Sequence, residues 1–238
     1  MFSAPSALLA AALSRDPSGP LITYYDDESS ERTELSAATF ANWVAKTANL
    51  LRDELDVEPG ERVCLLLPAH WQTAVVLLAV WSLGAVPAMT PADADVIVAD
   101  EPALATALDS GAREVLGLSL APMNGGLTSV RAGVVDYAAE VLSAGDEFSV
   151  IEPAGQTEAA AASMWAKRVG LTSDDRVLVA DTPGVAGAID WLLTPLAAQA
   201  SIVLCHNADP GQLPRRVADE RVTATLGVTV EGVRRLDD

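Results

Sequence analysis

The most hydrophobic stretch of the chain lies within residues 57–89 and predicts a β-α-β unit. Residues 63–67 run without a polar break, as in a strand that is buried on both faces of a parallel sheet. Between residues 71 and 83 the apolar side chains are too many for one helix face, so we expect a helix that is buried nearly all round. Gly84 ends this helix, and residues 86–89 return as a second strand after a right-handed crossover.

The residues before this unit predict a helix, a hairpin and a second helix. Residues 5–13 form a short Ala/Leu pattern that ends at a cluster of proline and glycine. The strand patterns at residues 21–25 and 32–35 flank a polar turn, as in a β-hairpin. Residues 39–55 repeat apolar side chains at helical spacing.

After the β-α-β unit, helix and strand patterns alternate, which is typical of α/β proteins. Helices are predicted at residues 103–110, 134–142, 159–169 and 191–198. Strands are predicted at residues 96–99, 115–120, 148–151, 201–205 and 221–228, and in the segment that ends just before Asp181. We expect two related sheet layers. One contains the strands at Val63, Val96 and Val115, and the other receives the N-terminal hairpin and the strands at Ser201 and Thr223.

The composition narrows the range of partners. The chain has 238 residues, half of them apolar, and a formal net charge of −18. Nucleic acids and anionic membranes are bound by clustered Lys and Arg, so we expect neither as a partner. The predicted helix at residues 71–83 is also shorter than the roughly 20 residues of a membrane span. No basic residue precedes the first apolar run, so we expect no signal peptide and a cytoplasmic protein.

The cysteines and histidines offer no sign of a metal centre. Cys64 and Cys205 lie inside apolar strand patterns, as buried free thiols do in a reducing compartment. His70 and His206 are the only histidines, and neither has a Cys, His, Asp or Glu at ligand spacing. We therefore expect no metal and no resident cofactor.

The central stretch also resembles a known family. PGERVCLLLP, followed by a helix that ends in LAVWSLGAVP, is similar to the start of the N-terminal domain of AMP-forming synthetases. These are the acyl-CoA synthetases, the luciferases and the adenylation domains of peptide synthetases. The resemblance implies an α/β fold of mostly parallel sheets layered with helices, here as one incomplete AMP-binding-like domain over residues 1–238. The Ala/Arg/Val-rich, Lys-poor composition resembles that of small bacterial fragment-like proteins of this superfamily.

Two departures from the family bear on activity. The family's Ser/Thr/Gly-rich phosphate loop ends in a lysine, whereas residues 152–158 read EPAGQTE. Phosphate needs many converging donors, and the two carboxylates of this stretch repel it. The chain also ends at Asp238, before the family's adenine and ribose motifs and the small C-terminal lid domain with its catalytic lysine. No residue of this chain can be assigned those roles.

One loop remains as a candidate ligand pocket. The run VLVADTPG places Asp181, Thr182 and Gly184 directly after a predicted strand, and open α/β sheets bind ligands at the carboxyl ends of their strands. A GTPase switch has a similar run, but it works with a phosphate loop, and the sequence contains no Gly-Lys pair. In the synthetases this loop carries a bulky gate residue to the acyl pocket, and Gly184 falls at or beside its position.

Two functions remain open. The first is a catalytically degenerate protein that serves as an interaction or ligand-binding module, with an unidentified protein or an acyl-type small molecule as partner. The alternative is a synthetase-like enzyme with residual adenylating or acyl-transfer activity, possibly completed by a partner chain, for which ATP, AMP or CoA would be required. We also expect a homodimer, because the strand at residues 221–228 would leave an unpaired edge unless the tail after Val230 folds back as a short helix whose charged end shields it.

Overall fold

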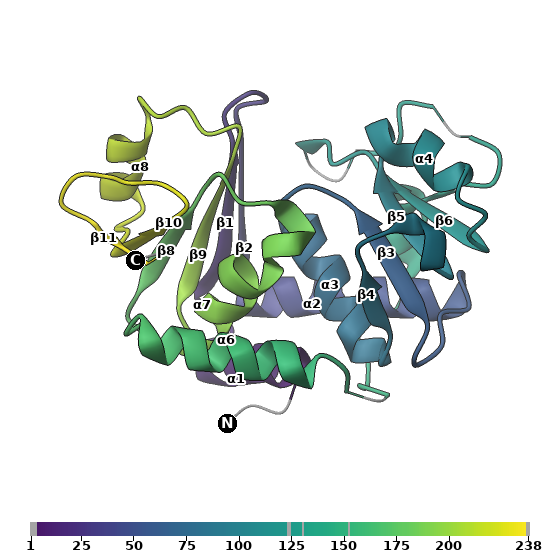
Figure 1. Ribbon diagram of the computed structural model, residues 1–238, viewed down its shortest axis with the longest axis horizontal. Helices are drawn as coiled ribbons and strands as arrows, with labels where there is room; N and C mark the ends of the chain where they lie inside the picture. Colours follow the sequence, from purple (N-terminus) through teal and green to yellow (C-terminus); the bar gives the residue numbers. More distant parts are fainter. Residues whose placement is uncertain (1–3, 123–124, 130, 152, 237–238) are drawn as a thin grey trace. The chain divides into compact units, whose positions relative to one another are not determined.

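The computed structural model describes residues 4–122, 125–129, 131–151 and 153–236. The chain divides into two compact units, each built on its own sheet (Figure 1). Unit 1 consists of Met1–Ala41, Ala69–Trp71 and Gln156–Asp238, and unit 2 of Asn42–Pro68 and Gln72–Gly155. Both units combine mainly parallel strands with helices, so the predicted α/β fold class is confirmed.

The sheet of unit 1 has the strand order β11-β10-β8-β9-β1-β2. Only β2 is antiparallel to its neighbour, because it closes the N-terminal hairpin with β1. The bounds are β1 (Pro20–Asp26), β2 (Glu31–Ser36), β8 (Arg176–Val179), β9 (Ser201–His206), β10 (Ala224–Leu226) and β11 (Arg234–Arg235).

Unit 1 has helices packed on its sheet. Its helices are α1 (Pro5–Arg15), α6 (Gln156–Arg168), α7 (Thr194–Ala198) and α8 (Leu213–Asp219), with a 3-10 turn η5 (Gly184–Gly187) and a π-helix η6 (Ile189–Leu193). Helices α1, α6 and α7 contact one another. Leu213 of α8 joins a separate buried cluster with Leu178, Val203 and Cys205 of the sheet. The sheet therefore has a buried apolar face under α8.

The sheet of unit 2 is parallel throughout, in the order β4-β3-β5-β6-β7. The strands are β3 (Arg62–Leu66), β4 (Val86–Ala88), β5 (Val96–Asp100), β6 (Glu114–Leu118) and β7 (Val135–Asp136). The helical elements are α3 (Trp71–Leu83), α4 (Leu104–Leu108), α5 (Tyr137–Glu140), η1 (Pro91–Asp93), η2 (Glu101–Ala103) and η4 (Val141–Ser143). Helix α2 (Ala37–Asp53) enters unit 2 at Asn42.

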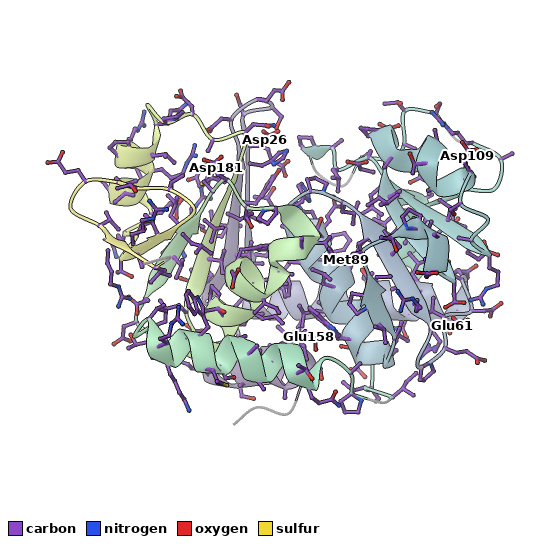
Figure 2. All side chains as sticks on the ribbon, viewed as in Figure 1. Asp26, Glu61, Met89, Asp109, Glu158 and Asp181 are labelled. Atoms are coloured by element: carbon purple, nitrogen blue, oxygen red, sulfur yellow. The ribbon has the colours of Figure 1, made fainter. Side chains whose placement is uncertain are left out.

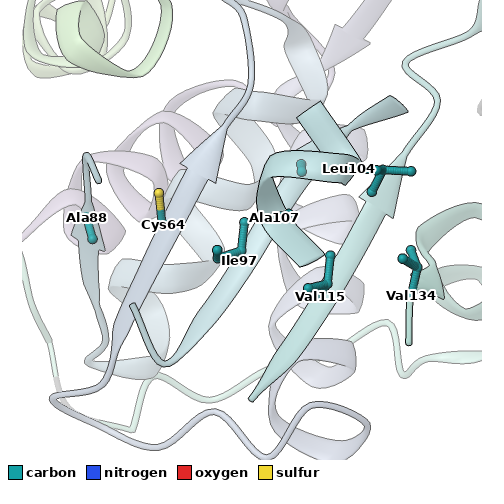
Figure 3. Close-up of a cluster of buried hydrophobic side chains, with 8 residues drawn as sticks. Cys64, Ala88, Ile97, Leu104, Ala107, Val115 and Val134 are labelled. Carbon is teal, nitrogen blue, oxygen red and sulfur yellow. The ribbon is translucent and has the colours of Figure 1, made fainter. Parts of the chain in front are cut away.

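Small and branched apolar side chains form the core between α4 and the sheet of unit 2 (Figure 3). Cys64, Ile97 and Val115 come from three neighbouring strands, and Leu104 and Ala107 come from α4. All five are buried. Every residue of α3 is also buried, which confirms the prediction of a helix without a solvent face.

The distribution of strands between the two sheets agrees with the prediction. The strands at Val63, Val96 and Val115 share one sheet, and the hairpin shares the other with the strands at Ser201 and at residues 224–226. That prediction rested on the spacing of the hydrophobic runs together with the resemblance to AMP-forming synthetases.

Several predictions of local structure were wrong. Residues 148–151 form no strand, because the amide of Ile151 donates to the carbonyl of Ser82 at the end of α3 (3.3 Å) rather than to a strand. The predicted helix at 134–142 begins as strand β7, and the one at 191–198 is entered through a π-helix that begins at Ile189. The predicted loop at 123–128 lies partly outside the described residues.

The strand β10 is not at an edge of its sheet. The tail after Val230 folds back as strand β11, not as the predicted short helix, and β11 pairs in parallel with β10 through Arg234 and Arg235. The amide of Leu236 then donates to the carbonyl of Thr225 (2.9 Å). This backbone pairing occupies the edge from which we expected a homodimer.

Candidate functional site

Strand β8 is the point at which the strand order of unit 1 reverses. The next strand in the chain, β9, lies on one side of β8, and β10 lies on the other. Connections on the two sides of such a strand diverge, which opens a crevice at its carboxyl end, where open α/β sheets bind ligands. The predicted pocket residues Asp181, Thr182 and Gly184 lie directly after this strand.

The three predicted residues differ in exposure. Asp181 is exposed and Thr182 is partly buried, whereas Gly184 is buried at the start of η5. Asp181 has a φ of 51° and Gly184 a φ of 63°, so both adopt the left-handed conformation. A non-glycine residue in this conformation costs of order 1–2 kcal/mol, which the surrounding structure must offset.

The backbone of the loop is held from both sides. The amide of Ala180 donates to the carbonyl of Leu226 (3.1 Å), which continues the pairing of β8 with β10. The α-carbon of Gly227 approaches so closely that a methyl group there would lie 1.9 Å from the carbonyl oxygen of Ala180. On the other side, the buried indole of Trp191 donates from Nε1 to the carbonyl of Gly184 (2.7 Å). The loop is therefore rigidly positioned.

The loop leads into a π-helix, a form that is often found at functional sites. Asp190 lies in this π-helix and is exposed, and the protein that covers one side of it raises the pKa of its carboxyl. An acid with a raised pKa beside a switch-point loop is a candidate functional group. The prediction from sequence did not include Asp190, because no motif marks it.

Acidic side chains gather at the carboxyl edge of this sheet. Strands β1, β8 and β9 run in parallel, so Asp26 at the end of β1 and Asp181 after β8 lie at the same edge (Figure 2). Hydrogen bonds from the amides of Glu28 and Ser29 and from the side chain of Asn207 satisfy Asp26. A ligand with several negative charges would be repelled here.

The counterpart of the family's phosphate loop is fastened to unit 2. The amide of Ile151 donates to the carbonyl of Ser82, and the amide of Ala154 to that of Trp81, both at 3.3 Å. These two N–H groups are therefore not directed at a ligand. The first turn of α6, which follows the loop, carries Glu158. A carboxylate in this turn occupies the favourable end of the helix dipole that a phosphate would otherwise use.

The segment that precedes this loop is clamped onto α2 by polar contacts. The ammonium group of Lys46 donates to the carbonyls of Leu142 (3.2 Å) and Ala144 (2.7 Å) and pairs with Asp146 (2.6 Å). One turn later, Nδ2 of Asn49 donates to the carbonyls of Gly145 and Glu147, each at 2.9 Å. We call residues 142–148 the clamped segment.

A buried charge network in unit 1 was not predicted. The carboxylate of Glu220 accepts hydrogen bonds from Tyr25 (2.5 Å), Arg32 (2.9 Å) and Arg176 (2.5 Å). Burial would raise the pKa of Glu220, but these donors outweigh it and lower the pKa to about 2. The partners lie on distant parts of the chain, so no local motif could reveal them. They stabilise the fold and lie apart from the β8 loop.

His70 has no Cys, His, Asp or Glu at metal-ligand spacing in the sequence, and the structure shows it buried in the core of unit 1. In the structure its ring lies edge-on against Tyr24, with 4.3 Å between the ring centres, and it is 2% exposed. Burial lowers the pKa of His70 to about 3, so the ring is neutral at physiological pH. Among the described residues, no cluster of three His, Cys, Asp or Glu side chains is placed to hold a metal ion. The described part of the chain contains no helix that is both long and apolar enough to cross a membrane.

The family of AMP-binding enzymes matches residues 9–108 of the chain. A TIGR03089 family protein of Mycobacterium tuberculosis is 47% identical over 236 residues, which cover 92% of this chain and 96% of that protein. The crystal structure of an acyl-CoA synthetase from Brucella canis superposes with a TM-score of 0.75 at 19% identity, covering 92% of this chain. The crystal structure of the N-terminal domain of FACL13 from Mycobacterium tuberculosis superposes with a TM-score of 0.74 at 16% identity, covering 94% of this chain. This chain spans 47% and 62% of those two chains, respectively.

Proposed function

This chain belongs to the TIGR03089 family, and we propose that it is a binding module on an AMP-binding fold that does not adenylate carboxylic acids. The fold is that of the N-terminal part of acyl-CoA synthetases. Adenylation needs the phosphates of ATP to be held while charge develops on them, and preorganised donors supply most of that stabilisation. The proposal therefore depends on whether this chain can hold phosphates.

The observation that carries the proposal is the counterpart of the phosphate loop. It has no lysine, and the amide of Ala154 within it and that of Ile151 just before it are bonded to carbonyls at the end of α3. Releasing both amides for a ligand would cost about 1 kcal/mol per hydrogen bond before any phosphate was bound. The first turn of α6 carries Glu158, whose negative charge disfavours a phosphate at that end of the helix. These terms all disfavour ATP.

The acidic carboxyl edge of unit 1 supports the same conclusion. Asp26 and Asp181 lie at the edge where an α/β sheet usually binds its ligand (Figure 2). A binding site at the carboxyl end of β8 would therefore suit a neutral or singly charged ligand better than a triphosphate. An acyl-type small molecule or a segment of a partner protein meets this condition.

The test is exchange of pyrophosphate into ATP, measured across a panel of fatty and aryl acids. A complete acyl-CoA synthetase serves as the positive control. We expect no exchange above the rate without protein. Exchange that rises in proportion to the concentration of this protein would overturn the proposal and favour the alternative of residual adenylating activity.

Binding at the β8 loop is tested separately by thermal shift with acyl-CoAs, free acids and nucleotides. We expect an acyl compound to raise the melting temperature, and Asp181→Asn to change that rise by altering the charge at the loop. Asp174→Asn is the matched control, because its side chain is 95% exposed at the other end of β8. Equal shifts in both variants would exclude the β8 loop as the binding site.

A further inference from the structure

A cavity of about 460 Å³ lies in unit 2 at the carboxyl ends of β5 and β6. Its wall includes Glu101, the first residue after β5, and Ser119, the first after β6. The volume falls within the roughly 300–1,000 Å³ of small-molecule sites. The position is also the edge at which parallel sheets bind ligands. Neither the β8 loop nor the clamped segment contributes to it.

The walls of this cavity are held in place by hydrogen bonds. Oε1 of Glu101 accepts from the amide (2.6 Å) and the hydroxyl (2.7 Å) of Thr128. The hydroxyl of Ser119 donates to the carbonyl of Gly125. The amide of Leu127 donates to Asp136 (3.1 Å). Residues 125–128 are thus bonded to Ser119, Glu101 and Asp136, so the backbone on this side of the cavity is held before a ligand binds.

Three polar groups at the cavity keep unused bonding capacity. Within the described ranges, the guanidinium of Arg131 makes no hydrogen bond or ion pair, and the hydroxyl of Ser129 makes no hydrogen bond. The second carboxylate oxygen of Glu101 accepts none of the bonds that its first oxygen receives. One cation, one hydroxyl and one carboxylate oxygen are therefore available to a ligand.

These groups define the chemistry of the ligand. A single guanidinium matches a single carboxylate, which it binds through two parallel hydrogen bonds. A carboxylate oxygen such as that of Glu101 accepts from hydroxyl groups, and the hydroxyl of Ser129 both donates and accepts. The apolar part of the wall is small, since only Pro102 and Leu104 contribute to it. A long acyl chain would find little apolar surface there.

We propose that this cavity binds a hydroxylated carboxylic acid of the sugar-acid type. The carboxylate lies against Arg131, and the hydroxyl groups bond to Glu101 and Ser129. This site is independent of the proposed function, because it uses none of the residues aligned with the phosphate loop and none at β8.

The experiment is a titration of isotope-labelled full-length protein followed by amide NMR. The probes are glycerate, gluconate and glucuronate, with glucose as the neutral control and hexanoate as the apolar acid control. We expect saturable shifts at the amides of Glu101, Ser119 and Ser129 with a sugar acid, and at least about tenfold weaker binding of glucose and hexanoate, since each lacks one set of charge-assisted or hydroxyl contacts.

Variants assign the contacts. Arg131→Ala should weaken the binding of the sugar acid at least about tenfold, because it removes both hydrogen bonds to the carboxylate. Lys167→Ala removes the same charge from an exposed position in unit 1 and should leave binding unchanged. The proposal is overturned if no sugar acid shifts these amides, if glucose or hexanoate binds equally well, or if Arg131→Ala binds as the parent does.

Discussion

Glu220 accepts hydrogen bonds from Tyr25 and Arg32, which lie 195 and 188 residues away in the chain, and from Arg176, 44 residues away. The side chains of Glu220 and Arg176 are only 8% and 13% exposed. Two charges buried this far are costly unless each keeps its partner. The network therefore ties the hairpin, β8 and the end of α8 together.

We expect Glu220→Gln to lower the free energy of unfolding by about 3 kcal/mol, because it leaves the buried Arg176 with only the more exposed Glu34, 3.8 Å away, as a counter-charge. The measurement is urea unfolding at neutral pH. The comparison variant is Glu34→Gln, which removes the more exposed carboxylate of the same network. Glu34 is 41% exposed and lies 3.8 Å from Arg176, so this change should cost less than about 1 kcal/mol. Equal losses of unfolding free energy in the two variants would contradict the role of Glu220 as the main buried counter-charge of Arg176.

The same carboxyl predicts a dependence on pH. The pKa of Glu220 is lowered to about 2 by its donors against the opposing effect of burial. Its contribution is therefore complete above the pKa of an unfolded glutamate, about 4.3, and is lost as the pH falls toward 2. The difference in stability between the parent protein and Glu220→Gln should shrink across this range. A difference that stays constant from pH 6 to about 2 would be inconsistent with this linkage.

Gly227 tests the rigidity of the β8 loop. Its φ is 79°, and a methyl group would lie 1.9 Å from the carbonyl oxygen of Ala180. Gly232 has the same φ of 79°, but no atom lies within 4 Å of its added methyl group. Both Gly→Ala changes cost about 1–2 kcal/mol for the left-handed backbone, and we expect about 1–3 kcal/mol more at Gly227. Thermal unfolding of the two variants side by side measures that difference, which should be near zero if the loop yields freely.

At the scale of the elements, the sequence predicts what depends on local pattern. The helix at residues 71–83 and the strand at Val96 were predicted because uninterrupted apolar runs determine both type and burial. Residues 148–151 have a similar apolar character, yet the amide of Ile151 bonds to α3, and no local pattern encodes that contact. The π-helix at Ile189 is equally invisible, because its composition is that of an ordinary helix.

Helix α2 gives a prediction about local opening. Replacing Lys46 by Met keeps the apolar part of the side chain and removes the ammonium group that holds the clamped segment. We expect roughly tenfold faster hydrogen exchange at the amide of Ala144. Without the hydrogen bonds of the ammonium group, the free energy of local opening should fall by about 1–2 kcal/mol. Lys167→Met in α6 is the control. An unchanged rate at Ala144 would mean that Asn49 alone holds the segment.

At the scale of the whole molecule, the separation of strands into two sheets was predictable, but the candidate site was predictable only in part. The loop with Asp181, Thr182 and Gly184 follows from strand order, since β8 ends where the connections diverge. The cavity beside β6 was not found, because its wall joins Glu101 to Thr128, Ser129 and Arg131 through contacts that the sequence does not encode. The role of either place as a binding site stays a prediction.

Self-association needs a surface other than β10, because β11 covers that edge. The edge strand β4 is a poor alternative. Its amide at Val86 donates inward to Glu61, so the next residue, Pro87, faces outward and has no N–H to offer. The homodimer stays a prediction, without the unpaired edge of β10 as its reason. Light scattering at micromolar concentration tests this, and a monomeric mass that does not change on dilution would contradict it.

The two free cysteines lie one in each unit, so their reaction with a thiol reagent reports the local opening of each unit separately. Cys64 belongs to unit 2 and Cys205 to unit 1, and they are 0% and 4% exposed. Burial raises the pKa of both thiols, that of Cys205 to about 11, so neither is a ready nucleophile in the folded chain. A thiol reagent therefore reacts with each sulfur only when the surrounding unit opens. When one cysteine is replaced at a time, the labelling rate of the remaining cysteine measures how often its unit opens.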